Sequence, residues 1–183
     1  MKKYSITALI LTLIAGICAA LIASVNLLTA PIIEKNNNEK KENLCHQIFL
    51  TYDSENSKVE TEHFQSDRIQ EAILAYDSSH EFLGYIYTVS GSNSFGNITL
   101  LVGITADEKL VGVRFITNGQ SFSNEAATHL NTQYKKDMTL DNILDLDLSN
   151  ADVTAGATYA SKLIRSLVED AFKDIAVREN GGN

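Results

Sequence analysis

The chain has 183 residues, 44% of them hydrophobic and 8% aromatic, and a formal net charge of -8. This length allows one compact domain and one additional element, but not two full domains. Because phosphate binding needs clustered Lys and Arg, the acidic balance excludes nucleic acid as an expected partner. Two cysteines are too few for a disulfide framework, and the four histidines show no metal-ligand spacing.

The N-terminal segment has the composition of a membrane-spanning helix. No charged residue occurs from Tyr4 to Ile33, and at helical rise this run covers about 45 Å, more than the roughly 30 Å hydrocarbon core. A secretory signal peptide has a shorter apolar region, so we expect an uncleaved anchor over residues 1–33, with a cleaved signal as the alternative. Lys2 and Lys3 favour a single pass across the cell membrane, with the N-terminus cytoplasmic and the domain outside.

The next segment is expected to join the anchor to the domain. Pro31 predicts that the spanning helix ends or kinks nearby. Residues 34–48 begin with a charged, Asn-rich stretch and are predicted to form a juxtamembrane stalk, either solvated or helical. The extracytoplasmic domain is then expected over residues 49–183.

Four segments of this domain have strand composition and predict an antiparallel sheet. Ile69–Tyr76 and Phe82–Val89 flank a turn of Asp-Ser-Ser-His. Ile98–Thr105 and Leu110–Thr117 are rich in β-branched residues and predict a β-hairpin. The Gly- and Ser-rich stretch between the second and third strands, residues 91–96, is predicted to be a loop.

Two helices are predicted in the second half of the domain. Residues 125–134 form the first, with Ser123 as its expected cap. The second is the C-terminal helix, in which apolar residues recur at helical spacing from Leu163 to Ile175 and charged residues fall on the other side. An amphipathic helix packed on an antiparallel sheet places the domain in the α+β class. The acidic segment from Met138 to Leu148 gives no clear assignment.

A stretch of small residues, from Asp152 to Ser161, directly precedes the C-terminal helix and is interpreted as a turn that leads into it. Unpaired backbone N–H groups at a helix N-terminus bind anions such as phosphate. Gly156 and the alanines let a bulky group approach the backbone, and Thr158 offers a hydroxyl group. On spacing alone, the simpler interpretation is helix capping by Asp152, Thr154 and Thr158.

The pattern Asp152-x-x-x-Gly156-Ala157-Thr158, with Ser161 three residues further on, resembles the flavinylation motif of the FMN-binding domain family. That family includes the G subunit of the Rnf electron-transport complex and the C subunit of the sodium-translocating NADH:quinone reductase. The resemblance implies that a flavin transferase attaches FMN to Thr158 through a phosphoester bond. It also implies that Asp152, Gly156 and Ala157 belong to the signal read by the transferase. The expected cofactor-binding residues are Thr158, Asp152, Thr154, Gly156, Ala157 and Ser161.

The resemblance covers most of the chain in order. Parts of residues 11–32 are similar to the anchor helix of Rnf G subunits, and parts of residues 96–113 resemble the central hairpin of the family. Two differences stand out. Ala155 occupies a position where the family usually has Ser or Thr, and residues 117–125 replace a His-x-Glu-Thr-Pro-Gly-Leu-Gly stretch that helps form the flavin pocket.

The resemblance implies an electron-transfer subunit of a multi-subunit oxidoreductase and translocase, not a stand-alone enzyme. The bound flavin would supply redox chemistry that no side chain offers, on a route from ferredoxin towards NAD⁺ that the complex couples to ion translocation. Its partners would be the other membrane subunits of an Rnf-type complex. The alternatives with the same chemistry are a C-type subunit of the quinone reductase and a stand-alone flavinylated carrier. The alternative from a different class is a membrane-anchored interaction module without flavin.

Overall fold

The computed structural model describes residues 2–148 and 155–180. The chain divides into two compact units, Met1–Lys40 and Lys41–Asn183, and each is described by itself. The expected boundaries of anchor, stalk and domain at residues 33 and 48 stay a prediction.

A single long helix, α1 (Lys2–Ile48), begins the chain and continues through Pro31. The segment Ala8–Ile48 is long and apolar enough to cross a membrane. The expected end of the helix near Pro31 is therefore wrong. The helix continues because it tolerates the loss of the one backbone hydrogen bond that proline removes. The juxtamembrane stretch is helical as well, and Lys35 and Glu39 form an ion pair of 3.7 Å one turn apart within it.

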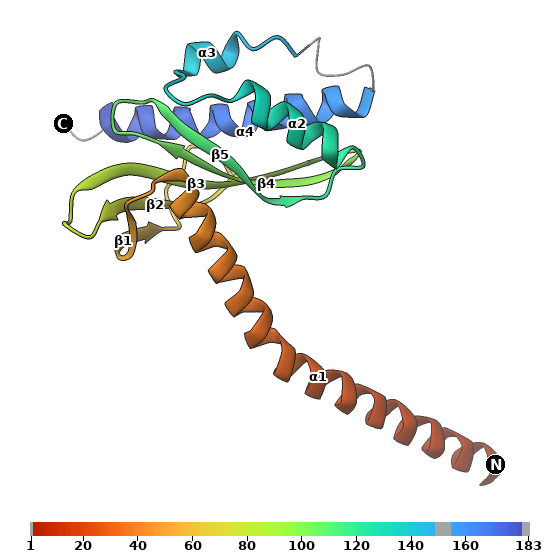
Figure 1. The fold of residues 1–183 in the computed structure, drawn as a ribbon. Coiled ribbons are helices and arrows are strands. Elements are labelled where there is room, and N and C mark those ends of the chain that lie inside the picture. The colour runs from red at the N-terminus through yellow and green to blue at the C-terminus, as the bar shows by residue number, and fades with distance from the viewer. Residues whose placement is uncertain (1, 149–154, 181–183) are drawn as a thin grey trace. The chain divides into compact units, whose positions relative to one another are not determined.

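The second unit contains a five-stranded antiparallel sheet in which neighbours in sequence are also neighbours in space (Figure 1). Its strands are β1 (Tyr52–Glu60), β2 (Ile69–Asp77), β3 (Phe82–Asn93), β4 (Gly96–Ile104) and β5 (Leu110–Asn118). Strands β2 to β5 confirm the four predicted segments. Strand β1 was not predicted because its sequence is mostly polar, and it lies at the edge of the sheet, paired with β2 alone.

The connection between β3 and β4 is a tight turn, so the predicted loop over residues 91–96 is wrong. The two strands stay paired up to Asn93 and Gly96. Gly96 has a φ of +138°, and a Cβ atom at this position would lie 2.0 Å from the carbonyl oxygen of Gly119. Only glycine fits such a backbone, which shows that the glycine serves the turn and not a flexible loop.

Three helices lie on one side of the sheet (Figure 1). They are α2 (Ser123–Gln133), α3 (Leu140–Leu144) and α4 (Ala155–Asn180). The apolar face of α4, including Ile164, Leu167 and Phe172, packs on Val89 and Leu100 of the sheet. This arrangement confirms the predicted α+β class.

The remaining predictions for the helices are met in part. α2 covers the expected residues up to Gln133, and Tyr134 is its C-cap. Its N-cap is Phe122, so the predicted cap at Ser123 is wrong. α3 falls in the segment that the sequence left unassigned, and its N-terminus is capped by Thr139 together with Asn142. The opposite face of the sheet is covered by the end of α1 and the residues after it, through a second apolar cluster. That cluster comprises Cys45, Ile48, Phe49, Tyr52, Ile73, Ala75, Ile86 and Leu101.

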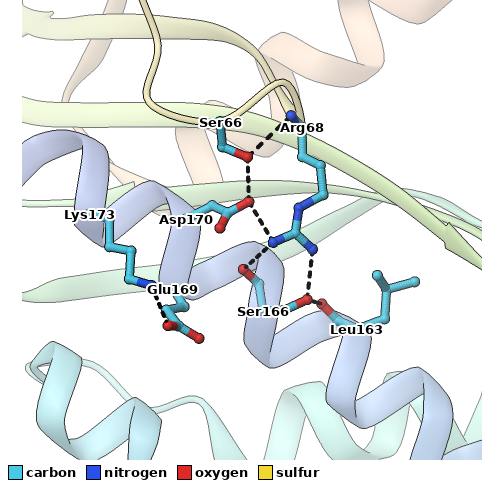
Figure 2. Close-up of polar contacts among 7 residues, drawn as sticks. All are labelled: Ser66, Arg68, Leu163, Ser166, Glu169, Asp170 and Lys173. Atoms are coloured by element: carbon cyan, nitrogen blue, oxygen red, sulfur yellow. Dashed lines mark hydrogen bonds and ion pairs between the residues drawn. The ribbon is translucent and has the colours of Figure 1, made fainter.

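Polar contacts attach the connection between β1 and β2 to the C-terminal half of α4. Arg68 donates a hydrogen bond of 2.9 Å to the hydroxyl oxygen of Ser166 and forms an ion pair of 2.7 Å with Asp170 (Figure 2). The hydroxyl group of Ser66 donates to the same carboxylate at 2.7 Å. One guanidinium group therefore joins the connection to two successive turns of the helix.

The next turn of α4 carries a second attachment, centred on Asp174, whose side chain is 1% exposed. Its carboxylate accepts hydrogen bonds from the backbone N–H of Gln65 at 2.8 Å and from Nε of Arg178 at 2.6 Å. Arg178 also pairs with Glu60 and lies over the ring of Phe64. We refer to these two attachments, through Arg68 and through Asp174, as the α4 clamp.

Candidate functional site

Helix α4 begins earlier than the sequence predicted. It is helical from Ala155, so Gly156, Ala157 and Thr158 lie in its first turn and not in a turn that precedes it. The alanines explain the difference, because alanine has the highest helix propensity and outweighs the single glycine. Two of the expected site residues, Asp152 and Thr154, lie outside the described residues.

The first turns of α4 separate the expected site residues by their exposure. Four buried residues recur at the spacing of one helix face, the face that packs on the sheet: Ala157, Ala160, Ser161 and Ile164. Thr158 is partly exposed. The hydroxyl group of Ser161 donates a hydrogen bond of 2.9 Å to the carbonyl oxygen of Ala157. The Thr158 side chain therefore reaches the accessible side of the helix, whereas Ser161 is turned into the core.

The start of a helix also provides electrostatics that suit a phosphate group. The first backbone N–H groups of an α-helix have no partners within the helix, and the helix dipole places partial positive charge there. Lys162 lies one turn after Thr158, at the i, i+4 spacing that brings side chains together on a helix surface. A phosphate on Thr158 would thus have an ammonium group on the same side of the helix.

Phe95 brings together three aromatic side chains, one of them that of Tyr159, the residue after Thr158. We refer to these three side chains as the aromatic cluster. Tyr159, the residue after Thr158, has its ring centroid 5.5 Å from that of Phe95 in the β3–β4 turn. The ring of Phe95 lies 6.0 Å from that of Phe122, which precedes α2. Lys162 places its Nζ atom 5.9 Å from the Tyr159 centroid. The sequence reasoning missed both phenylalanines, because no periodicity connects them with residue 158.

Residues 117–125, where the sequence differs from the family pattern, run beside the β3–β4 turn. The backbone N–H of Gly119 donates to the carbonyl oxygen of Asn97, and that of Ser121 donates to the carbonyl oxygen of Phe95, both at 2.9 Å. Gln120 is only 5% exposed. Its Nε2 donates to the carbonyl oxygen of Gly96 at 2.7 Å, whereas its Oε1 has no hydrogen-bond partner among the described residues.

These features fit a cofactor that combines a phosphate group with an aromatic ring. A helix start with a partly exposed threonine suits the phosphate, and the partly exposed aromatic cluster offers a surface for a ring. The buried, unpartnered oxygen of Gln120 costs roughly 1–3 kcal/mol while it stays unsatisfied.

Comparison with known proteins supports the same interpretation. Residues 1–48 match the family model of the RnfG N-terminal region, and residues 95–173 match that of the FMN-binding domain. The chain is 27% identical over 180 residues to the G subunit of the ion-translocating oxidoreductase complex of Pasteurella multocida (strain Pm70). That alignment covers 90% of this chain and 89% of the relative. The FMN-binding match contains Phe95, Gln120 and Thr158, so the site described above lies within it. The chain is therefore an RnfG-like protein with an FMN-binding domain.

Proposed function

We propose that this chain is the membrane-anchored electron-transfer subunit of an Rnf-type complex and that it carries FMN bound covalently to Thr158. The two family matches and the relative, a subunit of an ion-translocating oxidoreductase complex, support the assignment to such a complex. One structural observation carries the covalent part of the proposal. Within the FMN-binding match, Thr158 is a partly exposed residue in the first turn of a helix.

The attachment is a phosphoester between the Thr158 hydroxyl oxygen and the FMN phosphate, installed by a flavin transferase. The start of α4 stabilises the negative charge of the phosphate through its free N–H groups and its dipole. Gly156 has no side chain, so the transferase and the flavin approach the backbone closely there, whereas Ala157 is buried against the sheet. Asp152 and Thr154 complete the recognition signal in this proposal, and Ser161 supports the turn from within the core.

The bound FMN supplies the redox chemistry, and the protein holds it and sets its surroundings. The apolar segment of α1 keeps the domain at the membrane, where the other subunits of the complex lie. Lys2 and Lys3 favour a cytoplasmic N-terminus, and in this proposal the FMN therefore lies on the outer side. A covalent link then has a clear use, because a dissociated flavin would be lost by diffusion outside the cell.

The test is an intact-mass measurement on the full chain, purified from its native host or co-expressed with a flavin transferase. Wild-type protein is expected to show the added mass of one phosphoester-linked FMN, and Thr158→Ala is expected to show none. Ser161→Ala is the matched control, since it removes a nearby hydroxyl that is buried and already hydrogen-bonded. We expect this control to retain the added mass.

Two outcomes would contradict the covalent attachment. The first is wild-type protein without added mass when the same transferase loads a second, established substrate. The second is a Thr158→Ala protein that still carries FMN. The assignment to an Rnf-type complex is tested separately, by purifying the anchored chain from native membranes and identifying the subunits that accompany it. Recovery with quinone reductase subunits, or with no other subunit, would overturn that assignment.

A further inference from the structure

We infer that the aromatic cluster, Phe95, Phe122 and Tyr159, binds the isoalloxazine ring of the FMN attached to Thr158. This inference rests on the proposed function, which supplies the attached cofactor, and it names the side chains that contact the ring. It also gives residues 117–125 a role, because Phe122 and Gln120 both belong to that segment.

The position of the cluster relative to the attachment point is the first argument. Tyr159 directly follows Thr158, and Phe95 lies 5.5 Å from Tyr159 between ring centroids. The cluster therefore begins at the residue next to the phosphoester. A covalent link raises the effective concentration of the ring at nearby surfaces to the millimolar range. Even a surface with low intrinsic affinity for the ring would then be occupied.

The exposure of the cluster is the second argument. Tyr159 is 54% exposed, although it is a large aromatic residue, and Phe95 and Phe122 are only partly buried. Aromatic rings pair favourably in stacked or edge-to-face arrangements at centroid distances of about 4.5–7 Å. Covering this surface with a flavin ring would remove apolar area from water, which is favourable in itself.

Two amide side chains beside the cluster supply the polar complement of the ring. Gln120 is held through its Nε2 by the carbonyl oxygen of Gly96, and its Oε1 is unpartnered among the described residues. Asn93 is held through its Oδ1, which accepts from the backbone N–H of Phe95 at 2.9 Å, and its Nδ2 is likewise unpartnered there. Buried polar groups usually have partners. Here the unpartnered atoms are one acceptor and one donor, and both are shielded from solvent. The N–H and carbonyl groups on the edge of an isoalloxazine ring would pair with them once these two side chains turn towards the cluster.

The experiment uses FMN-loaded full-length protein and the variant Tyr159→Ala, with Tyr76→Ala as the matched control. Tyr76 is a partly buried tyrosine on β2 that pairs with Phe82, outside the cluster. Covalent FMN is quantified by intact mass, ring exposure by iodide quenching of flavin fluorescence, and ring ordering by visible circular dichroism. Because one aromatic pair contributes roughly 0.5–1.5 kcal/mol, the ratio of docked to free ring should fall about 2- to 12-fold in Tyr159→Ala.

The expected result is an unchanged FMN mass, greater iodide quenching and a weaker visible circular dichroism signal in Tyr159→Ala, with Tyr76→Ala like the wild type. Unchanged quenching and dichroism in loaded Tyr159→Ala would overturn the inference while leaving the proposed function intact. Absence of FMN from the wild type would overturn both, and the mass measurement separates this outcome from the previous one. If Tyr159→Ala loads poorly, Phe122→Leu provides the same readouts, because Phe122 is distant in sequence from the attachment motif and leucine keeps an apolar side chain there.

Discussion

The two ends of helix α4 pack on the same sheet but differ in chemistry. At the C-terminal end, Arg68 pairs with Asp170 (Figure 2), and Arg178 pairs with Asp174 in the second half of the α4 clamp. At the N-terminal end, Thr158 is partly exposed and has small residues as its neighbours in sequence. At the C-terminal end, which we call the clamp end, the charged side chains form ion pairs with one another. At the N-terminal end, which we call the site end, Thr158 stays partly exposed. The contrast indicates that the helix is fixed at one end so that a group can be presented at the other.

The cost of burying a charge explains why the clamp can fix the helix. An ionised carboxylate that is 1% exposed, as Asp174 is, is strongly unfavourable without partners. The partners must therefore stay in place, and they come from the connection between β1 and β2 as well as from α4 itself. This requirement sets the position of α4 along the sheet and hence the position of Thr158.

The largest effect is expected from Asp174→Ala, which breaks the clamp at its buried centre. Arg178 and the backbone N–H of Gln65 lose their acceptor, and removing one partner of a buried pair costs about 3–5 kcal/mol. Urea unfolding of the full chain in detergent micelles measures the loss. Lys173→Ala is the control, because Lys173 forms an exposed pair with Glu169, and such pairs contribute little. A loss in Asp174→Ala no greater than in this control would show that the clamp does not hold the helix.

Much of this fold follows from sequence periodicity. The alternation and β-branched composition of four strands predicted β2 to β5, and the spacing of apolar residues predicted α4. The failures have physical causes. β1 is polar, and its pairing with β2 arises from tertiary contacts that override its low strand propensity. The β3–β4 turn has loop composition, but Gly96 is required there because the carbonyl oxygen of Gly119 lies too close for a side chain.

The candidate site was predictable only in part. Thr158 was identified through the motif it shares with a family, and its position in the first turn of a helix suits that role. Phe95 and Phe122 could not be identified, because the contacts between the aromatic rings depend on how the β3–β4 turn and the segment before α2 fold around each other. Gln120 was equally hidden, since an unpartnered oxygen is a property of the folded chain.

A smaller effect is expected from Arg68→Ala, which removes the partly exposed half of the clamp. The loss of contacts to Ser166 and Asp170 should lower the free energy of unfolding by about 1–2 kcal/mol, since hydrogen bonds to charged groups are strong but solvent screens this pair. Arg68→Lys should restore part of the loss, because lysine keeps the charge without the planar fork. Urea unfolding checks both values.

The same variant tests whether attachment of FMN at Thr158 depends on the α4 clamp. If the clamp only fixes the helix, Arg68→Ala protein that remains folded should accept FMN on Thr158 to the same extent as the wild type, by intact mass. A folded Arg68→Ala protein with reduced FMN content would break the comparison. It would mean that the clamp also controls the geometry of the site end.

The smallest effect is expected from a histidine near the site end, in α2, which follows Phe122 directly. His129 is 8% exposed, and its Nε2 has no hydrogen-bond partner among the residues that the structure describes. Burial lowers the pKa of His129 below its ordinary value of 6.5. As the pH falls through 6.5, the unfolded chain binds a proton at this residue before the folded chain does. The free energy of unfolding therefore decreases as the pH falls from neutral through 6.5, until the folded chain binds the proton as well.

The variant His129→Leu should flatten this part of the pH profile of unfolding, because the residue that titrates differently in the two states is gone. His80→Asn is the control: His80 is exposed at a turn with a φ of 63°, which asparagine tolerates. The control should keep the slope of the wild type, and a His129→Leu profile with that same slope would assign the acid sensitivity to another group. At the clamp end the buried Asp174 carboxylate has its partners beside it. The Nε2 atom of the buried His129 has none among the described residues, so protonation of this imidazole on acidification should destabilise the folded chain.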